Sequence, residues 1–527
     1  MAKKSFYVTT PIYYVNDVPH IGHAYTTLAC DIMARFKRLD GYDVKFLTGT
    51  DEHGQKVHKA AQAKNLDPQT LTDVLSQSFR DLCELMNYSN DDFIRTTEER
   101  HKIAAQALWK KLEENGHIYL DRYAGWYAVR DEAFYAESEL VTNDAGEKIA
   151  PTGAPVEWME EESYFFNLSK WQEPLLKLYE ENPDLIQPKS RYNEVVSFVK
   201  GGLRDLSISR TSFDWGVPVP GAEDKHVMYV WIDALTNYMT AVGYPEIEGA
   251  DFKTFWPEVV HVLGKDILRF HAVYWPAFLL AAGISTPKKI VAHGWWTIEG
   301  CKMSKSLGNV IAPKHLVDTY GLDQTRYFLM REVPFGNDGD FSHAQMISRI
   351  NSDLAGGIGN LAQRTLSMIF KNCDGKLPNV TEADYNAEDR ALLDVLYGLL
   401  DKVRLHIDEQ AFNKALDVIW LEGIAAANQY VDEQAPWALR KTDIERMNVV
   451  LYVLAESLRI IALLTQAFMP DTISKLLDQL GVIKPQRQLA WAKAEHAISG
   501  GLEIKKPEGL FPRYVEENEE LNIEKKA

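Results

Sequence analysis

The strongest constraint on the fold is a strand–loop–helix–strand pattern in the first fifty residues. Residues 5–10 (SFYVTT) predict a short buried strand, and the Pro, Asn and Gly residues of 11–22 predict a loop. A helix is predicted from His23, because apolar residues then recur every four positions, and 42–50 predict a second strand. Such a β-α-β unit indicates a parallel sheet.

A second segment of this kind begins near residue 258. Residues 258–266 predict a strand, 267–284 a helix and 288–296 another strand. Ligands of open α/β sheets bind at the carboxyl ends of the strands. The loops expected at those ends are 11–23, 51–54, 264–266 and 293–309.

The rest of the chain divides into two regions that differ in amino-acid composition and periodicity. Residues 116–226 are rich in Tyr, Trp, Gly, Pro and acidic residues, which predicts an insertion that splits the nucleotide-binding fold. After about residue 350 the chain is predicted to be helical. Apolar residues in 451–468 recur at intervals of three or four up to Pro470, which is typical of a helix-bundle core.

Charge and cysteine content exclude some classes of protein. The net charge of −18 argues against a non-specific nucleic-acid coat protein but permits a local basic site. The four cysteines contain no C-x-x-C pair, so they suggest neither a zinc knuckle nor a disulfide framework. We expect no membrane span, and with no signal-peptide pattern we expect a cytoplasmic protein.

The segment PHIGH (19–23) has the chemistry of a phosphate site. His20 and His23 flank Gly22 where the loop enters the predicted helix, and a helix N-terminus favours phosphate. Imidazoles there can donate hydrogen bonds to phosphate oxygens, while the glycine lets a ligand approach the backbone. The alternative is a polar loop with capping histidines.

The segment GCKMSKSLGN (300–309) is a second phosphate-seeking element. Lys302 and Lys305 are flexible point charges, Ser304 and Ser306 add hydroxyl donors, and the flanking glycines let the loop move. The alternative is a solvated surface loop. The chain shows neither a Walker P-loop nor a G-x-G-x-x-G fingerprint in the first strand unit.

HIGH (20–23) and KMSKS (302–306) are the paired signatures of class I aminoacyl-tRNA synthetases. The surrounding segments TPIYYVNDVPHIGHAYT, LTGTDEHGQK, YVWIDALTNY, GKDILRFH and EQAPWALRK resemble the methionyl-tRNA synthetase family. The resemblance implies a class I Rossmann-type α/β fold split by a connective insertion and followed by an all-α helix-bundle domain. The implied boundaries are 1–115 and 227–325 for the two catalytic halves, 116–226 for the insertion, 326–350 for a stem-contact linker, 351–510 for the helical anticodon-binding domain and 511–527 for a charged tail.

The resemblance also implies the activity. The family joins methionine to ATP, releases pyrophosphate and transfers the methionyl group to the 3′-terminal adenosine of tRNA(Met), for translation initiation and elongation. His20, His23, Lys302 and Lys305 would be catalytic, acting on the phosphates of ATP with Mg²⁺. The implied ATP-binding set is His20, Gly22, His23, Gly264, Asp266, His293, Gly294, Lys302, Met303, Ser304, Lys305 and Ser306. Catalysis of this reaction is positioning plus electrostatic stabilisation.

A methionine site follows from the same resemblance. Asp51 would bind the amino group of methionine, although it could also cap a helix that starts near Glu52. The implied side-chain pocket is Ile12, Tyr14, Trp231, Ala234, Leu235, Tyr238, Ile267 and His271. Aromatic rings around a thioether are favourable. Without the resemblance, Trp231 and Tyr238 would be interpreted as core residues.

For tRNA, Asn360, Arg364 and Trp437 fall where the family reads the anticodon of initiator and elongator tRNA(Met). Asn360 and Arg364 are one helical turn apart, so they share a face. Trp437 follows Pro436, outside a helix interior, where its ring could stack on a base. The alternatives are a helix-surface pair and a buried tryptophan.

The chain departs from many family members in its insertion. Ala128 and Asp131 stand where a first zinc-binding cysteine pair is expected, and the second pair is absent from DAGEKIAPTGAP. We therefore expect no metal site and no structural zinc. The insertion is too short for a large editing domain, and with no appended oligonucleotide-binding domain a monomer is expected.

Three other functions remain open at this point. A sister class I synthetase for leucine, valine, isoleucine or cysteine is disfavoured by the short insertion and the missing cysteines. A non-catalytic tRNA-binding relative would show damaged signatures, and both are intact. A nucleotidylyltransferase would lack the long helical region.

Overall fold

A computed structural model describes residues 3–15, 17–131, 133–143, 145–222, 225–302 and 310–515. The chain divides into two compact units. The first unit comprises Met1–Ala34 and Asp43–Trp295, and the second comprises Arg35–Tyr42 and Trp296–Ala527.

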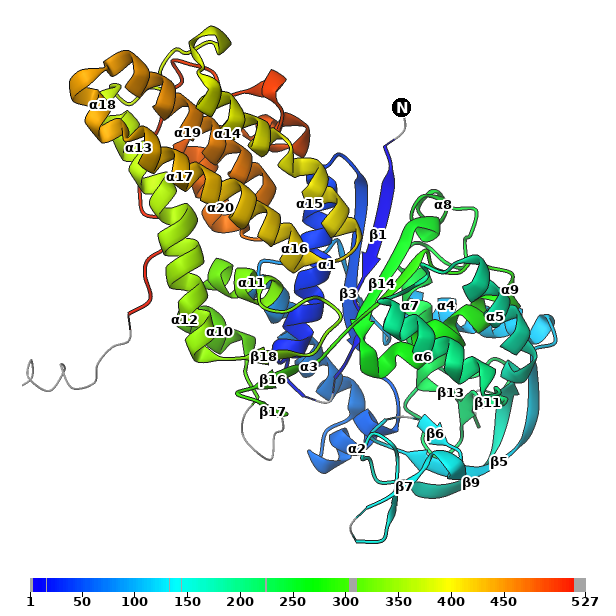
Figure 1. The fold of residues 1–527 in the computed structure, drawn as a ribbon. Coiled ribbons are helices and arrows are strands. Elements are labelled where there is room, and N and C mark those ends of the chain that lie inside the picture. The colour runs from blue at the N-terminus through cyan, green and yellow to red at the C-terminus, as the bar shows by residue number, and fades with distance from the viewer. Residues whose placement is uncertain are drawn as a thin grey trace, which may run out of the picture. The chain divides into compact units, whose positions relative to one another are not determined.

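The first unit is built on a seven-stranded sheet with the order β10-β15-β14-β1-β3-β2, in which β4 also pairs with β3. All its strand pairs are parallel, which confirms the predicted sheet (Figure 1). The central strands are buried along nearly their whole length, as expected for a parallel sheet covered on both faces. The strands are β1 Ser5–Thr9, β2 Tyr13–Tyr14, β3 Asp43–Asp51, β4 Asp92–Arg95, β10 Ile186–Gln187, β14 Val259–Gly264 and β15 Lys289–His293.

Helices connect these strands. The predicted helix after the first loop is α1, and it begins two residues early, at Ile21. The predicted helix 267–284 is present as a π-helical stretch, Phe270–Tyr274, that continues into α9. The helices of this sheet are α1 Ile21–Leu39, α2 Gln55–Ala63, α3 Pro68–Leu85, α4 Glu99–Glu114, α7 Val230–Thr240, α8 Ala250–Phe255 and α9 Trp275–Ala282.

The insertion carries an antiparallel sheet of its own, with the order β11-β9-β5-β6. Its strands are β5 Ile118–Ala128, β6 Ala133–Tyr135, β9 Glu157–Phe166 and β11 Leu206–Ser207, and two helices lie between β9 and β11 in the chain, α5 Gln172–Glu181 and α6 Lys189–Lys200. Strand β10 also lies within the insertion, yet it pairs with β15 of the large sheet. The insertion therefore contributes a strand to the sheet that it interrupts.

The second unit begins with a small sheet, β17-β16-β18, and continues as helices. Its strands are β16 Trp296–Ile298, β17 Cys301–Lys302 and β18 Gly339–Phe341. Its helices are α10 Pro313–Tyr320, α11 Leu322–Arg331, α12 His343–Arg349, α13 Asn360–Asn372, α14 Ala387–Tyr397, α15 Leu399–Asp408, α16 Phe412–Asp417, α17 Ala425–Gln434, α18 Pro436–Thr442, α19 Ile444–Thr465 and α20 Pro470–Gln479. The predicted helical region is thus confirmed.

Helix α19 is the core of this helical region. It packs against α13, α14 and α17. In the described residues it alone has the length and apolar composition of a membrane span, but 94% of its most apolar window is buried inside the protein. Its apolar face is therefore occupied by neighbouring helices, as the periodicity predicts. Pro470 lies after the end of α19, and it is also the first residue of the next helix, α20.

Candidate active site

The two signature histidines meet at the start of α1. The backbone N–H of His20 donates to Nδ1 of His23 at 3.1 Å, and the N–H of Gly22 donates to Nδ1 of His20 at 3.1 Å. The ring centroids lie 3.8 Å apart. Because each Nδ1 accepts a hydrogen bond, each neutral ring carries its proton on Nε2. The pair therefore offers two N–H donors beside a helix N-terminus.

Both rings are held in the neutral form. Burial lowers the pKa of His20, against the opposing effect of the Asp266 carboxylate. Burial and the neighbouring His20 ring lower the pKa of His23 well below its ordinary value. At neutral pH the two rings therefore act as hydrogen-bond donors rather than as cations.

Gly22 has a steric reason to be glycine. A Cβ at this position would lie 2.9 Å from Cε1 of His20 and 3.1 Å from its Nδ1. Real contacts are not that short, so any side chain would displace the His20 ring. The alternative of capping histidines is also met, because Nδ1 of His20 accepts from the N–H of Gly22 at the start of α1, and a glycine there leaves room for the ring.

The predicted ribose and adenine residues lie at the ends of β14 and β15. Gly264 ends β14, and a Cβ there would lie 2.6 Å from Oδ1 of Asp266. His293 ends β15; its Nδ1 faces the carbonyl oxygen of Gly294 at 2.8 Å and its Nε2 faces the Thr26 hydroxyl at 2.7 Å. Since both ring nitrogens have partners within the protein, the ring of His293 is firmly oriented.

The residues predicted to surround the methionine side chain come together. Leu235 and Tyr238 belong to one buried apolar cluster, and Ile12, Tyr14, Trp231 and Ile267 pack against it. Ala234 and His271 are also buried. Six of the eight residues come from α7 and from β2 with the residue before it, so two segments distant in the sequence supply most of the predicted set. Phe270, absent from the predicted set, stacks on Trp231 at 3.8 Å between centroids.

His271 fixes the hydroxyl of Tyr238. Its Nδ1 lies 3.0 Å from the carbonyl oxygen of Ile267, and its Nε2 lies 2.7 Å from the Tyr238 hydroxyl. Since a carbonyl only accepts, Nδ1 carries the proton and Nε2 accepts from the tyrosine. Burial lowers the pKa of His271 to about 4, so this arrangement holds at neutral pH.

Asp51 is the last residue of β3, opposite Tyr14 of β2, and it is nearly buried. The prediction that it could cap a helix starting near Glu52 is wrong. Helix α2 begins at Gln55, and the residue before it is Gly54, with a φ of 106°. Glu52, His53 and Gly54 form a turn between the strand and the helix. Each of these three residues is hydrogen-bonded to a distant part of the chain, which holds the turn in place.

Sequence reasoning missed the polar residues that surround this turn. Arg95, at the end of β4, donates to both carboxylate oxygens of the buried Glu52, at 2.7 and 2.9 Å. On the other side, Asp233 of α7 accepts from His53 Nδ1 and His101 Nε2, each at 2.7 Å. Burial disfavours the ionised form of Asp233, but the two histidines outweigh that effect and lower its pKa to about 2.

The second signature lies mostly outside the described residues. Gly300 has a φ of 76°, a conformation that favours glycine, and Lys302 is the last residue of β17. The side chain of Lys302 and the whole of Met303, Ser304, Lys305 and Ser306 lie outside what the structure describes. Their predicted roles stay predictions.

Ala128 and Asp131, which stand where many family members are expected to carry a zinc-binding cysteine pair, make other contacts here. Ala128 packs in a small cluster with Ala133, Tyr135, Ala150 and Ala154. Asp131 accepts hydrogen bonds from the hydroxyls of Thr152 and Tyr135. Within the described part of the chain, no group of three His, Cys, Asp or Glu residues is arranged to hold a metal ion.

The predicted anticodon residues lie on neighbouring helices of the second unit. Asn360 and Arg364 occupy the first two turns of α13. The guanidinium of Arg364 lies 5.0 Å from the ring centroid of Trp437 and 2.7 Å from the carboxylate of Asp432. Trp437 is the second residue of α18 and is 44% exposed, so the alternative of a buried tryptophan is wrong.

Comparison with known proteins agrees with this geometry. The family of class I tRNA synthetases (M) matches residues 6–366, and the anticodon binding domain of methionyl tRNA ligase matches 378–526. The chain is 57% identical to the methionine–tRNA ligase of Rickettsia bellii over 513 residues, covering 97% of this chain and 99% of the relative. It is 54% identical to that of Brucella suis over 520 residues, covering 99% and 100%. A solved structure of Mycobacterium tuberculosis methionyl-tRNA synthetase in complex with methionyl-adenylate superimposes with a TM-score of 0.94, at 52% identity, over 97% of this chain and 100% of that one.

The parallel sheet with paired histidines at the start of its first helix, in a chain that also carries the sequence KMSKS at 302–306, agrees with the class I synthetase family match. The second family match and the full-length relatives narrow this class further. The chain belongs to the methionyl-tRNA synthetase family.

Proposed function

We propose that this chain activates L-methionine with ATP, releasing pyrophosphate, and transfers the methionyl group to the 3′-terminal adenosine of tRNA(Met). This is the reaction of a methionine–tRNA ligase. One observation carries the choice of methionine: the chain matches methionine–tRNA ligases at 54–57% identity along nearly the whole length of both proteins. A sister synthetase or a non-catalytic relative would not match in this way.

In this reaction the protein mainly positions the substrates and stabilises the developing charge. The methionine carboxylate is ionised at neutral pH, so it attacks the α-phosphorus without a general base, and pyrophosphate leaves. Negative charge grows on the phosphoryl oxygens, which the two Nε2–H donors of His20 and His23 are placed to stabilise. ATP enters as its Mg²⁺ complex, and the ion lowers the charge on the phosphates. From the family resemblance, we assign Lys302 and Lys305 to the same phosphates.

The methionine site has two parts. The buried apolar wall formed by Trp231, Leu235 and Tyr238 suits a thioether, because sulfur–aromatic contacts are favourable. Asp51, at the carboxyl end of β3, supplies a carboxylate for the ammonium group. Asp266 and Gly264 take the ribose, and His293 with Gly294 takes the adenine side.

The second unit supplies tRNA recognition. Trp437 offers an exposed ring for stacking, and the neighbouring Arg364 and Asn360 offer hydrogen-bond donors for unstacked bases. A few such contacts let a protein of net charge −18 bind RNA locally. We propose that both initiator and elongator tRNA(Met) are substrates, and that the enzyme works as a cytoplasmic monomer.

The test is amino-acid-dependent ATP–pyrophosphate exchange with methionine, leucine, isoleucine, valine and cysteine in turn, followed by aminoacylation of tRNA(Met). Exchange with methionine alone, lost in Lys305→Ala, is the expected result. Exchange driven by another amino acid would move the assignment to a sister enzyme. No exchange with any of them would mean a non-catalytic RNA-binding protein.

A further inference from the structure

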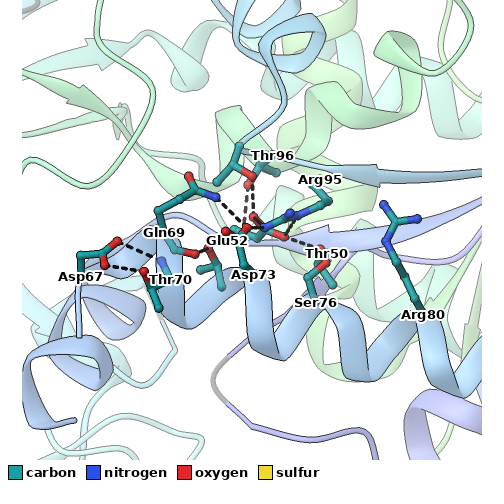
Figure 2. A network of polar contacts seen from close by, with 12 residues as sticks. Thr50, Glu52, Asp67, Gln69, Thr70, Asp73, Ser76, Arg80, Arg95 and Thr96 are labelled. Atoms are coloured by element: carbon teal, nitrogen blue, oxygen red, sulfur yellow. Dashed lines mark hydrogen bonds and ion pairs between the residues drawn. The ribbon is translucent and has the colours of Figure 1, made fainter. Parts of the chain in front are cut away.

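The turn that follows Asp51 is held by an unusually dense set of polar contacts (Figure 2). Figure 2 shows Glu52 at the centre of this network, between Arg95 and Thr96 on one side and the α3 residues Asp73 and Ser76 on the other. Glu52 is fully buried. A buried carboxylate is costly unless it is paired and hydrogen-bonded, so its presence here calls for a reason.

Every polar group of Glu52 has a partner. Its carboxylate accepts from Arg95 through two nitrogens, from the Thr50 hydroxyl at 2.7 Å and from the Thr97 hydroxyl at 2.6 Å. Its backbone N–H donates to the Thr96 hydroxyl at 3.0 Å, and its carbonyl accepts from the Trp215 indole at 2.6 Å. Five hydrogen-bonding neighbours from β3, the end of β4 and a distant loop therefore fix one residue.

These contacts bear on Asp51, because they fix the residue that directly follows it. Asp51 is the last residue of β3 and Glu52 is the first residue after it, so the contacts of Glu52 fix the backbone on the carboxyl side of Asp51. The next residue is fixed as well, since the His53 carbonyl accepts from the Tyr14 hydroxyl at 3.0 Å and its ring is bonded to Asp233. The two residues that follow Asp51 are therefore both held by hydrogen bonds. Glu52 is bonded to Arg95 at the end of β4, and His53 is bonded to Tyr14 of β2 and to Asp233 of α7.

We propose that Glu52 and Arg95 are positioning residues for the methionine ammonium group, which act by holding the Asp51 carboxylate in the direction that the ammonium needs. This inference rests on the proposed function, in which Asp51 binds that ammonium. Arg95 also holds both carboxylate oxygens of Glu52, so the Glu52 carboxylate is engaged within the protein and does not compete with Asp51 for the ammonium group. A preformed carboxylate lowers the cost of ordering the site when methionine binds.

The test compares Glu52→Gln with a matched control, Asp73→Asn. Asp73 also pairs with Arg95, at 2.5 Å, but it is half-exposed and has no contact with the Asp51 turn among the described hydrogen bonds. In ATP–pyrophosphate exchange we expect Glu52→Gln to raise the KM for methionine about tenfold, or about 1.4 kcal/mol. The KM for ATP stays within about twofold in both variants, and Asp73→Asn leaves both constants within about twofold.

A substrate analogue separates positioning from general damage. 4-(Methylsulfanyl)butanoate keeps the thioether and carboxylate of methionine but lacks the amino group. Its inhibition constant stays unchanged in Glu52→Gln if the role of Glu52 is exerted through Asp51. Equal weakening of methionine and of this analogue would overturn the inference, and so would an unchanged KM for methionine.

Arg95→Lys provides a second variant should Glu52→Gln fail to fold. It keeps the positive charge but cannot bind both carboxylate oxygens in the same two-pronged way, so it should show the same selective loss of methionine affinity. Melting temperatures of all variants establish that the proteins are folded. If the wild-type protein shows no methionine-dependent exchange, the proposed function is overturned. If the wild type exchanges normally but the variants weaken methionine and its amino-free analogue equally, only this inference is overturned.

Discussion

Asp233 makes the most informative single substitution in the first unit. Its carboxylate is fully buried and accepts 2.7 Å hydrogen bonds from His53 and His101, whose side chains are at most 4% exposed. Carboxylates only accept, so both facing nitrogens carry protons. Asp233→Ala removes both partners at once, while Asp233→Asn keeps the shape and one accepting oxygen.

The two variants should lower the free energy of unfolding by different amounts. Asp233→Ala leaves two buried N–H groups without partners, at about 1–3 kcal/mol each, so we expect a loss of at least about 2 kcal/mol. In Asp233→Asn, the amide NH₂ faces one ring. His101 can then move its proton to Nδ1, where the Thr240 hydroxyl lies 3.3 Å away, and accept at Nε2. Both hydrogen bonds survive without charge assistance, so the expected cost is about 1 kcal/mol.

Thermal unfolding at pH 7 measures this difference. For a unit of this size, 1 kcal/mol corresponds to about 2–4 °C in Tm, so Asp233→Ala should melt at least about 4 °C below wild type and Asp233→Asn about 2–4 °C below. The folded pKa of Asp233 is lowered from 3.8 to about 2, so its stabilisation is complete above about pH 4 and is lost only as the pH falls toward 2. The gap between wild type and Asp233→Asn should therefore be constant from pH 6 to 8.

Two results would refute this reasoning. Equal losses for both variants would mean that charge, rather than the two hydrogen bonds, accounts for the effect. A Tm of Asp233→Ala within about 2 °C of wild type would mean that the histidines find other partners. Because Ala234 and Leu235 follow directly in α7, the KM for methionine in pyrophosphate exchange should rise with the loss of stability.

Three further predictions concern the phosphate and anticodon sites. Gly22→Ala should displace the His20 ring and slow pyrophosphate exchange about 10²-fold, as loss of a preorganised donor does, with the melting temperature as control. Because the pKa values of His20 and His23 are lowered, their contribution to stability is complete above pH 6.5 and falls at lower pH; the KM for ATP should be constant between pH 7 and 8.5, and a rise within that range would contradict neutral donors. Trp437→Ala should lower kcat/KM for aminoacylation about 10- to 100-fold, the worth of one stacked base, while Trp437→Phe keeps most of the activity; equal loss in both would argue against stacking.

Local pattern was enough to predict the sheet and to bring the two signature histidines together. The strands around HIGH are short, apolar and bounded by Pro and Gly, and the two histidines lie within four residues, so their meeting follows from the local chain. The predicted methionine pocket rests on the family resemblance, since nothing in the periodicity of α7 separates Trp231 and Tyr238 from ordinary core residues.

The missed contacts share a physical cause. Glu52 and Arg95 are 43 residues apart, and His53 and Asp233 are 180 apart, so their pairing depends on how strands and helices come together. For the same reason the helix expected near Glu52 is wrong: the tertiary hydrogen bonds of this turn outweigh local helix propensity. Strand β10 is only two residues long, too short for any periodicity to indicate it.

That two-residue strand has a consequence for engineering. Ile186 and Gln187 cover the outer side of β15, pairing with Ile290 and Val291. Deleting the insertion to make a smaller catalytic core would uncover an apolar edge with unpaired backbone N–H and C=O groups, a template for aggregation. A minimal version of this enzyme must keep Ile186–Gln187, or carry a charged or proline-bearing substitute along β15, to remain a single molecule in solution.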